Sequence, residues 1–155
     1  MTDDQLAFLD ASSLAGLLHS KKLSPVELTQ MMLHRIERVD KRLLSYATVT
    51  HDTALKQARE AEAMIMRRQI LSALHGVPIA LKDLCYTKDI VTAAGMPMMR
   101  DFKPSYDGTV VKRLREAGTV LLGKLTMTEA TTVKPKGLNH SPDTPGMNAT
   151  GMNTA

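Results

Sequence analysis

The sequence predicts an α/β or α+β domain in which helices pack on a small mixed sheet. Segments whose apolar residues recur at helical spacing alternate with short β-branched or wholly apolar runs, in the order strand, helix, strand, helix, strand. The chain has 155 residues, of which 43% are apolar, which is enough for one domain with a buried core. A net charge of only +4 argues against a disordered chain, and a single cysteine excludes a disulfide scaffold.

A first helix is expected around Leu14, Leu17 and Leu18, which recur at helical spacing and follow a cap at Ser12 or Ser13. A second helix should begin sharply at Ser24-Pro25, because serine is a good N-cap and proline suits the first helical position. Five apolar side chains form its inward face: Leu28, Met31, Met32, Ile36 and Val39.

The middle of the chain predicts two strands around a long helix. Residues 46–50 are short and β-branched and indicate a strand, and residues 52–69 form an alanine-rich helix against which another element can pack closely. Residues 77–81 indicate a second strand, in which Pro78 must lie at the start or at a sheet edge. Residues 90–94 are a candidate for a third short extended segment.

The last predicted elements are a helix over 109–117, ended by Gly118 in a left-handed conformation, and a strand over 119–122. That strand is apolar on both faces, which suits the middle of a sheet. Composition then changes abruptly, since residues 130–155 are rich in Pro, Thr and Asn and hold few large apolar side chains. We therefore expect a domain over 1–129 and an irregular or disordered tail over 130–155.

Several classes of protein are excluded by composition. Basic residues outnumber acidic ones by only 20 to 16 and are spread out, and aromatic residues make up 3%, so a nucleic-acid partner is not expected. No apolar run reaches the ~18 residues of a membrane span, and the acidic start predicts a cytoplasmic rather than a secreted protein. The five histidines are dispersed and Cys85 has no second thiol nearby, so no metal or cofactor is expected.

Lys82 is the most suggestive single residue, because it closes the apolar run Gly76-Val-Pro-Ile-Ala-Leu81 beside Asp83. Burial disfavours the ammonium form of a lysine and lets the neutral amine act as a base. The alternative is an exposed and inert Lys82–Asp83 neighbourhood at a strand end. Spacing alone leaves both interpretations open.

Several segments of the chain form an ordered set of motifs around Lys82. The central one is His75-Gly-Val-Pro-Ile-Ala-Leu-Lys-Asp83. The others lie within residues 8–129 and are Leu23-Ser-Pro-Val-Glu-Leu28, Arg35-Ile-Glu37, Ala54 to Ala61, Asp107 to Gly118 and Leu121 to Glu129. In sequence and in order this set resembles the amidase signature family, and the central motif is similar to the stretch that bears the catalytic lysine of that family. The resemblance implies the family fold, no cofactor, and hydrolysis of a small-molecule amide or ester by a serine–serine–lysine triad in which Lys82 is the general base.

The sequence departs from the family in the region that follows. Family members are much longer, and a Gly/Ser-rich loop with the bridging serine would begin near Thr144-Pro-Gly146, where Met147-Asn-Ala-Thr-Gly-Met152 stands instead. No residue here matches the bridging serine or the nucleophile, so only Lys82 is carried over.

Three hypotheses explain why the chain has a residue that matches the catalytic lysine of the family but none that matches the nucleophilic serine. In the first, the chain is a truncated amidase, with a tail produced by a shifted reading frame after about codon 129. In the second, it is a stand-alone hydrolase that uses Ser105, Ser141 or a tail threonine as nucleophile. In the third, it is a catalytically inactive remnant or binding module whose exposed strand edges and apolar helix faces favour a homo-oligomer.

Overall fold

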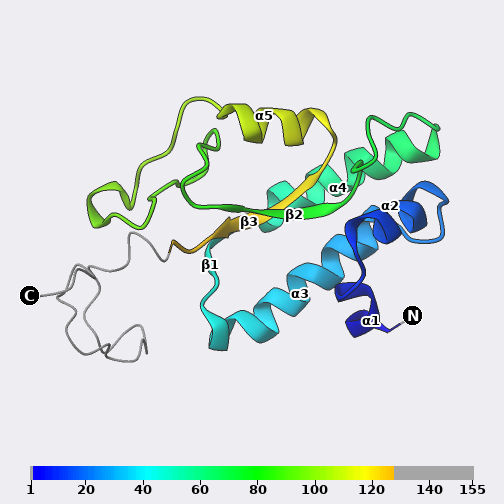
Figure 1. Cartoon of the computed structure of the whole chain (residues 1–155), viewed down its shortest axis with the longest axis horizontal. Helices are drawn as coiled ribbons and strands as arrows, with labels where there is room; N and C mark the ends of the chain where they lie inside the picture. Colours follow the sequence, from blue (N-terminus) through cyan, green and yellow to red (C-terminus); the bar gives the residue numbers. More distant parts are fainter. Residues whose placement is uncertain (1, 128–155) are drawn as a thin grey trace, which may run out of the picture.

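The structure of the protein is a computed structural model that describes residues 2–127, in which helices pack on both faces of a three-stranded mixed sheet (Figure 1). The expected class of fold is therefore confirmed. The elements, in chain order, are α1 (Asp3–Ala7), α2 (Ala11–His19), α3 (Pro25–Leu43), β1 (Tyr46–Val49), α4 (His51–Met66), β2 (Pro78–Lys82), the 3-10 helix η1 (Pro97–Met99), α5 (Thr109–Glu116) and β3 (Val120–Leu125). The predicted tail over 130–155 lies outside the described residues, so the domain boundary stays a prediction.

The strand order is β1-β3-β2, with β3 antiparallel to β1 and parallel to β2. The apolar run that begins at Thr119 is thus the central strand, as its apolar character predicts. Pro78 opens β2, which lies at an edge of the described sheet, so the missing N–H of proline is tolerated there. Parallel pairing places the carboxyl ends of β2 and β3 together, with Lys82 opposite Leu125.

Alternate side chains of β3 face two different hydrophobic clusters. Val120 and Leu122 pack with Leu33 of α3 and with Ala54 and Ala58 of α4. The small alanines let α4 approach the sheet closely, as the alanine-rich sequence predicts. On the opposite face, three buried residues form the second cluster: Leu81, Val111 and Leu121. The helices α3 and α4 thus cover one face of the sheet and α5 covers the other.

A third cluster joins α2 to the rest of the domain through Leu14, Ala15, Leu18, Leu28, Ile65 and Val77. The cap of α2 differs from the expected Ser12 or Ser13, because Asp10 is the N-cap and its carboxylate accepts a hydrogen bond from the Ser13 N–H at 2.9 Å. A carboxylate at a helix N-terminus satisfies a free N–H and also interacts favourably with the helix dipole. The N-cap of α3 is Ser24, as expected, with Pro25 in the first turn.

The expected extended segment over 90–94 is wrong, because these residues form a loop outside the sheet. The Thr92 hydroxyl bonds to the Ile90 carbonyl two residues earlier, and the Ala93 N–H bonds to the carboxylate of Asp83. Such local and side-chain hydrogen bonds compete with strand pairing.

Gly118 has a φ of +79°, as expected for the residue that ends α5, and a Cβ built on it would lie 2.4 Å from Cδ2 of His75. Only glycine fits both the conformation and the space. None of the helices within residues 2–127 combines the length and the apolar character needed to cross a lipid bilayer.

Candidate functional site

Lys82 lies at the carboxyl end of β2, where the chain leaves the sheet. The side chain of Leu81 just before it is buried in the core, whereas that of Lys82 is exposed. The Asp83 N–H donates to the Leu125 carbonyl at 2.9 Å, so the backbone after Lys82 is held against the central strand. The strand therefore presents Lys82 at the edge formed by the carboxyl ends of β2 and β3.

A second lysine, Lys124, is completely buried one position before the end of β3. Its Nζ donates to the Cys85 carbonyl at 2.9 Å and to the Thr92 Oγ1 at 2.9 Å, and it lies 3.3 Å from Oδ1 of Asp83. The three N–H donors of an ammonium group thus have three acceptors within reach. Burial lowers the pKa of Lys124, and the negative charge of Asp83 opposes this by raising it.

Asp83 is equally enclosed, with only 2% of its surface exposed. Its Oδ2 accepts a hydrogen bond from the Ala93 N–H at 3.0 Å, and its backbone carbonyl accepts one from the Ala94 N–H at 3.2 Å. Oδ1 is ion-paired with Lys124 without a well-directed hydrogen bond. The Lys124–Asp83 pair therefore joins the end of β2, the central strand and the 92–94 loop directly beside Lys82.

The lysine that is buried in an apolar strand is Lys124, and the side chain of Lys82 is exposed. Sequence reasoning missed Lys124. The sequence feature that could have indicated a buried lysine is its place inside the run Val120-Leu-Leu-Gly-Lys-Leu125. In an apolar central strand the amine of such a lysine cannot reach solvent. Its partner Asp83 comes from the end of a different strand, so the pair itself is visible only in the fold.

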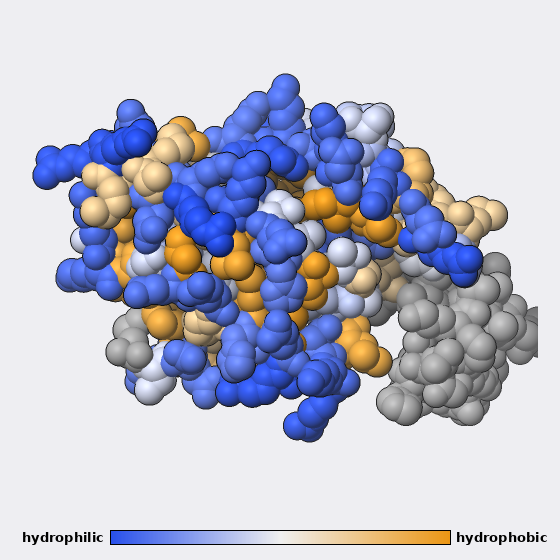
Figure 2. Space-filling view, turned by 180° about the vertical axis from the view of Figure 1, so that it is seen from behind, coloured by the Kyte–Doolittle hydropathy of each residue, from blue (hydrophilic) through white to orange (hydrophobic). Residues whose placement is uncertain are grey.

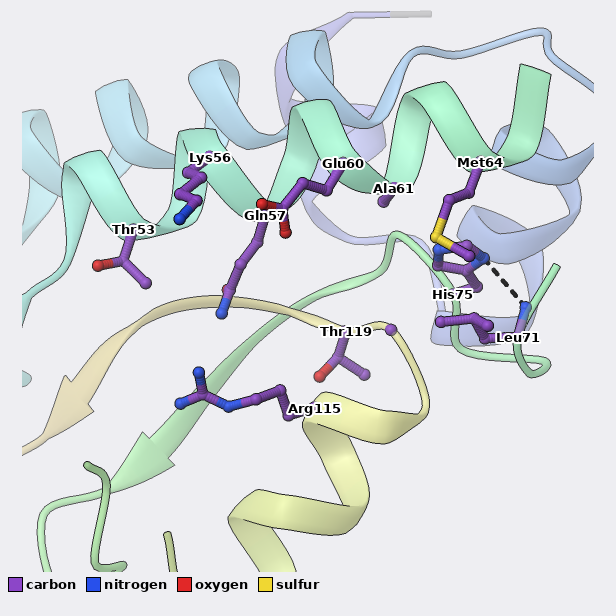
Figure 3. Close-up of a pocket in the computed structure, with 11 residues that line it drawn as sticks. Thr53, Lys56, Gln57, Glu60, Ala61, Met64, Leu71, His75, Arg115 and Thr119 are labelled. Carbon is purple, nitrogen blue, oxygen red and sulfur yellow. Dashed lines mark hydrogen bonds between the residues drawn. The ribbon is translucent and has the colours of Figure 1, made fainter. Parts of the chain in front are cut away.

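A pocket of about 320 Å³ lies elsewhere, between α4 and the turn that joins α5 to β3 (Figure 3). Both acidic and basic side chains line it, and the polar lining residues include Lys56, Glu60, Arg115 and Thr119. Thr119 precedes the first residue of β3, so this pocket borders the amino ends of the parallel strands. Lys82 stands at their carboxyl ends, and the pocket therefore does not contain it.

His75 also lines this pocket and is 1% exposed. Its Nδ1 accepts a hydrogen bond from the Leu71 N–H at 3.1 Å, drawn in Figure 3, and its backbone carbonyl lies 3.0 Å from Nε2 of His19. Burial lowers the pKa of His75, and the nearby His19 lowers it further. His75 therefore supports the fold as a neutral acceptor.

Ser105 lies in an exposed loop between η1 and α5, and Ser141 and the tail threonines lie outside the described residues. Within residues 2–127, no group of three or more His, Cys, Asp or Glu side chains is arranged to hold a metal ion.

Known proteins share both the sequence and the fold of this region. The profile of the Amidase family matches residues 27–135. AmiD of Mycobacterium bovis, whose name assigns it as an amidase, is 50% identical over 129 residues, which cover 83% of this chain and 27% of AmiD. A glutamyl-tRNA(Gln) amidotransferase subunit of Moorella thermoacetica is 45% identical over 125 residues, covering 81% of this chain and 26% of that protein.

Solved structures agree with the sequence comparison. The peptide amidase of Stenotrophomonas maltophilia superimposes with a TM-score of 0.72 at 34% identity, covering 77% of this chain and 25% of the enzyme. The chain thus spans about a quarter of the length of the proteins it matches.

Proposed function

Because the chain belongs to the amidase family, we propose that it carries the general base of a cofactor-independent hydrolase of amide and ester bonds, with Lys82 in that role. The observation that supports this most is the place of Lys82 at the carboxyl end of β2, beside β3. In sheets with parallel strands, ligands commonly bind at this edge. A neutral amine there can take the proton of an attacking hydroxyl.

The test compares Lys82→Ala with Lys88→Ala, a matched change of another exposed lysine, in the full 155-residue chain. Rates are measured on a p-nitroanilide and a p-nitrophenyl ester. We expect Lys82→Ala to lower the rate by about 10²–10⁴-fold, the usual contribution of a general base, and Lys88→Ala to retain the parental rate. Equal rates for the parent and Lys82→Ala would remove Lys82 from the mechanism.

The nucleophile is located in the same preparation by labelling with a fluorophosphonate and mapping the modified peptide. The candidates are Ser105, Ser141 and the tail threonines. We expect one of them to be labelled in the parent and to react more slowly in Lys82→Ala, because the base activates the hydroxyl.

A second candidate function is a non-catalytic, self-associating protein with no nucleic-acid or membrane partner. The sheet of residues 2–127 supports it, because β1 and β2 each pair on one side only, and open edges are templates for pairing between chains. Several apolar side chains are also exposed, among them Phe8, Leu44 and Met98. Figure 2 shows apolar side chains emerging between the hydrophilic ones on the face seen there. A parent chain that hydrolyses neither substrate and takes up no fluorophosphonate would favour this candidate.

A further inference from the structure

The pocket between α4 and the turn that joins α5 to β3 has no part in the proposed reaction. Its volume of about 320 Å³ lies in the range of small-molecule sites. It borders the amino ends of the parallel strands, whereas Lys82 ends β2 at the other edge. The pocket is therefore a site separate from the one to which the proposed function belongs.

One wall of the pocket is a stripe along a single face of α4. Its members follow helical spacing and are Thr53, Lys56, Gln57, Glu60, Ala61 and Met64. The polar side chains come first along the helix and the apolar ones last. A helix rises 1.5 Å per residue, so the positions of Gln57 and Met64 are roughly 10 Å apart along its axis. The pocket therefore has a polar end and an apolar end.

At the polar end, the side chain of Gln57 is oriented by the central strand. Its Oε1 accepts a hydrogen bond from the Leu121 N–H at 2.8 Å. The oxygen of the amide is thus engaged, and its N–H donors are the groups that remain for a ligand. Figure 3 shows Gln57 and Arg115 extending toward each other from α4 and α5. A donor held in place by the fold is suited to an acceptor with negative charge.

The charges of the lining also favour an anion. Two basic side chains, Lys56 and Arg115, stand against one acidic side chain, Glu60. The Nε of Arg115 lies 3.0 Å from Oδ2 of Asp107, which anchors the guanidinium and offsets part of its charge. Lys56 and Glu60 are exposed, so we expect each to change the affinity of a charged ligand only a few-fold.

The other end of the pocket is apolar. Ala61 and Met64 of α4 lie there with Leu71, and the buried ring of His75 closes this end. Figure 3 shows Met64, Leu71 and His75 together. His75 adds no charge, because burial lowers its pKa and so favours the neutral ring. The flexible thioether of Met64 can adapt to apolar groups of different shapes.

We propose that this pocket binds an elongated carboxylate, with the anionic group at Gln57, Lys56 and Arg115 and the apolar tail against Met64 and Leu71. The inference is independent of the proposed function, because none of these residues takes part in the proposed reaction.

The experiment titrates the full 155-residue chain, labelled with carbon-13 in its methionine methyl groups, with 4-phenylbutyrate. The Met64 signal is assigned with Met64→Leu. Two further probes, 4-phenylbutanol and 4-phenylbutylamine, have the same ring and chain but a neutral or a positive end group. We expect 4-phenylbutyrate to shift the Met64 signal saturably. It should bind at least about tenfold more tightly than 4-phenylbutanol, because hydrogen bonds to a charged group are the stronger ones.

Variants of the polar end separate charge from fold. Gln57→Glu keeps an acceptor for the Leu121 N–H but replaces the amide donors by a negative charge, so it should weaken binding by about tenfold or more. Glu60→Gln should strengthen binding by about two- to fivefold, because it removes the acidic group from the lining. Gln30→Glu and Glu37→Gln make the same charge changes on the exposed surface of α3 and should bind like the parent.

Several results would overturn the proposal. They are no saturable binding of 4-phenylbutyrate up to about 10 mM, equal or tighter binding of either other probe, and binding that leaves the Met64 signal unmoved. An unchanged affinity in Glu60→Gln would contradict the anionic end. If circular dichroism shows that Gln57→Glu does not fold, Lys56→Gln decides, and it should weaken binding about two- to fivefold. Lys82→Ala tests the proposed function separately and should bind 4-phenylbutyrate like the parent.

Discussion

Two lysines near the carboxyl ends of neighbouring strands have opposite environments. Lys82 ends an edge strand and is exposed, whereas Lys124 lies inside the central strand and is buried with Asp83. The difference follows from strand position, because a side chain at the end of an edge strand reaches solvent and one in the middle of a covered sheet does not.

The first prediction concerns the stability that the buried pair provides. Lys124→Met should lower the free energy of unfolding by about 3–5 kcal/mol, since it leaves the Asp83 carboxylate buried without a counter-ion. The double variant Asp83→Asn/Lys124→Met should recover most of this loss, because no charge remains buried. Urea unfolding at neutral pH measures both, with Lys112→Met as the control within about 0.5 kcal/mol of the parent. A double variant less stable than Lys124→Met would contradict the ion-pair explanation.

The second prediction concerns pH and His75. Burial lowers the pKa of His75 in the folded protein below its ordinary value of 6.5. As the pH falls below 6.5, His75 therefore takes up a proton in the unfolded chain before it does so in the folded one. The folded state loses stability until the pH is below the lower pKa that His75 has in the folded protein. The free energy of unfolding is measured with urea between about pH 7.5 and 5, a range that spans the ordinary histidine pKa. Over this range His75→Asn should lose less stability than the parent. His34→Asn, on the exposed surface of α3, should keep the parental slope. An unchanged slope in His75→Asn would assign the acid sensitivity to other groups.

At the scale of elements, most of the secondary structure was predictable because its signals are local. Apolar periodicity and the Ser24-Pro25 start predict α3 and α4 to within a few residues of their observed bounds. The segment 90–94 was mispredicted, since Ala93 bonds to the distant Asp83 carboxylate and Thr92 bonds within its own loop, which no local pattern reveals. The sequence likewise did not indicate that β3 continues beyond residue 122 to Leu125.

The third prediction concerns Gly118, which ends α5. Gly118→Ala should destabilise the protein by about 1–3 kcal/mol, because the residue has a left-handed conformation and a Cβ would collide with the His75 ring. Gly16→Ala is the matched control, since Gly16 lies within α2 and a Cβ there meets nothing within 4 Å. That control should raise the melting temperature, as alanine is favoured over glycine in a helix by about 1 kcal/mol. A Gly118→Ala variant as stable as the parent would show that the α5–β3 turn can readjust.

At the scale of the whole molecule, the described sheet ends at two strands that each lack a second neighbour within residues 2–127. The matched region makes up 27% of AmiD, and the two chains are 50% identical over it. The exposed Leu84 is the second residue after β2, close in the chain to the strand end at Lys82.

The prediction at this scale is concentration-dependent self-association, measured by sedimentation velocity. Leu84→Lys should weaken it, because a charge beside an edge strand opposes pairing between chains. Met66→Lys places the same charge on a similarly exposed apolar residue at the end of α4 and should associate like the parent. A parent that sediments as a monomer at all concentrations would exclude the self-associating alternative.

The sequence alone determined the class of fold, the central position of the apolar strand, the edge position of Pro78 and the resemblance that singles out Lys82. These properties depend on periodicity, on the geometry of proline and on contiguous motifs, all of which are local. Only the tertiary structure decided which lysine is buried and which carboxylate it binds. The reason is that Lys124 and Asp83 come from separate strands, and their burial depends on the loop and helix that close over the sheet.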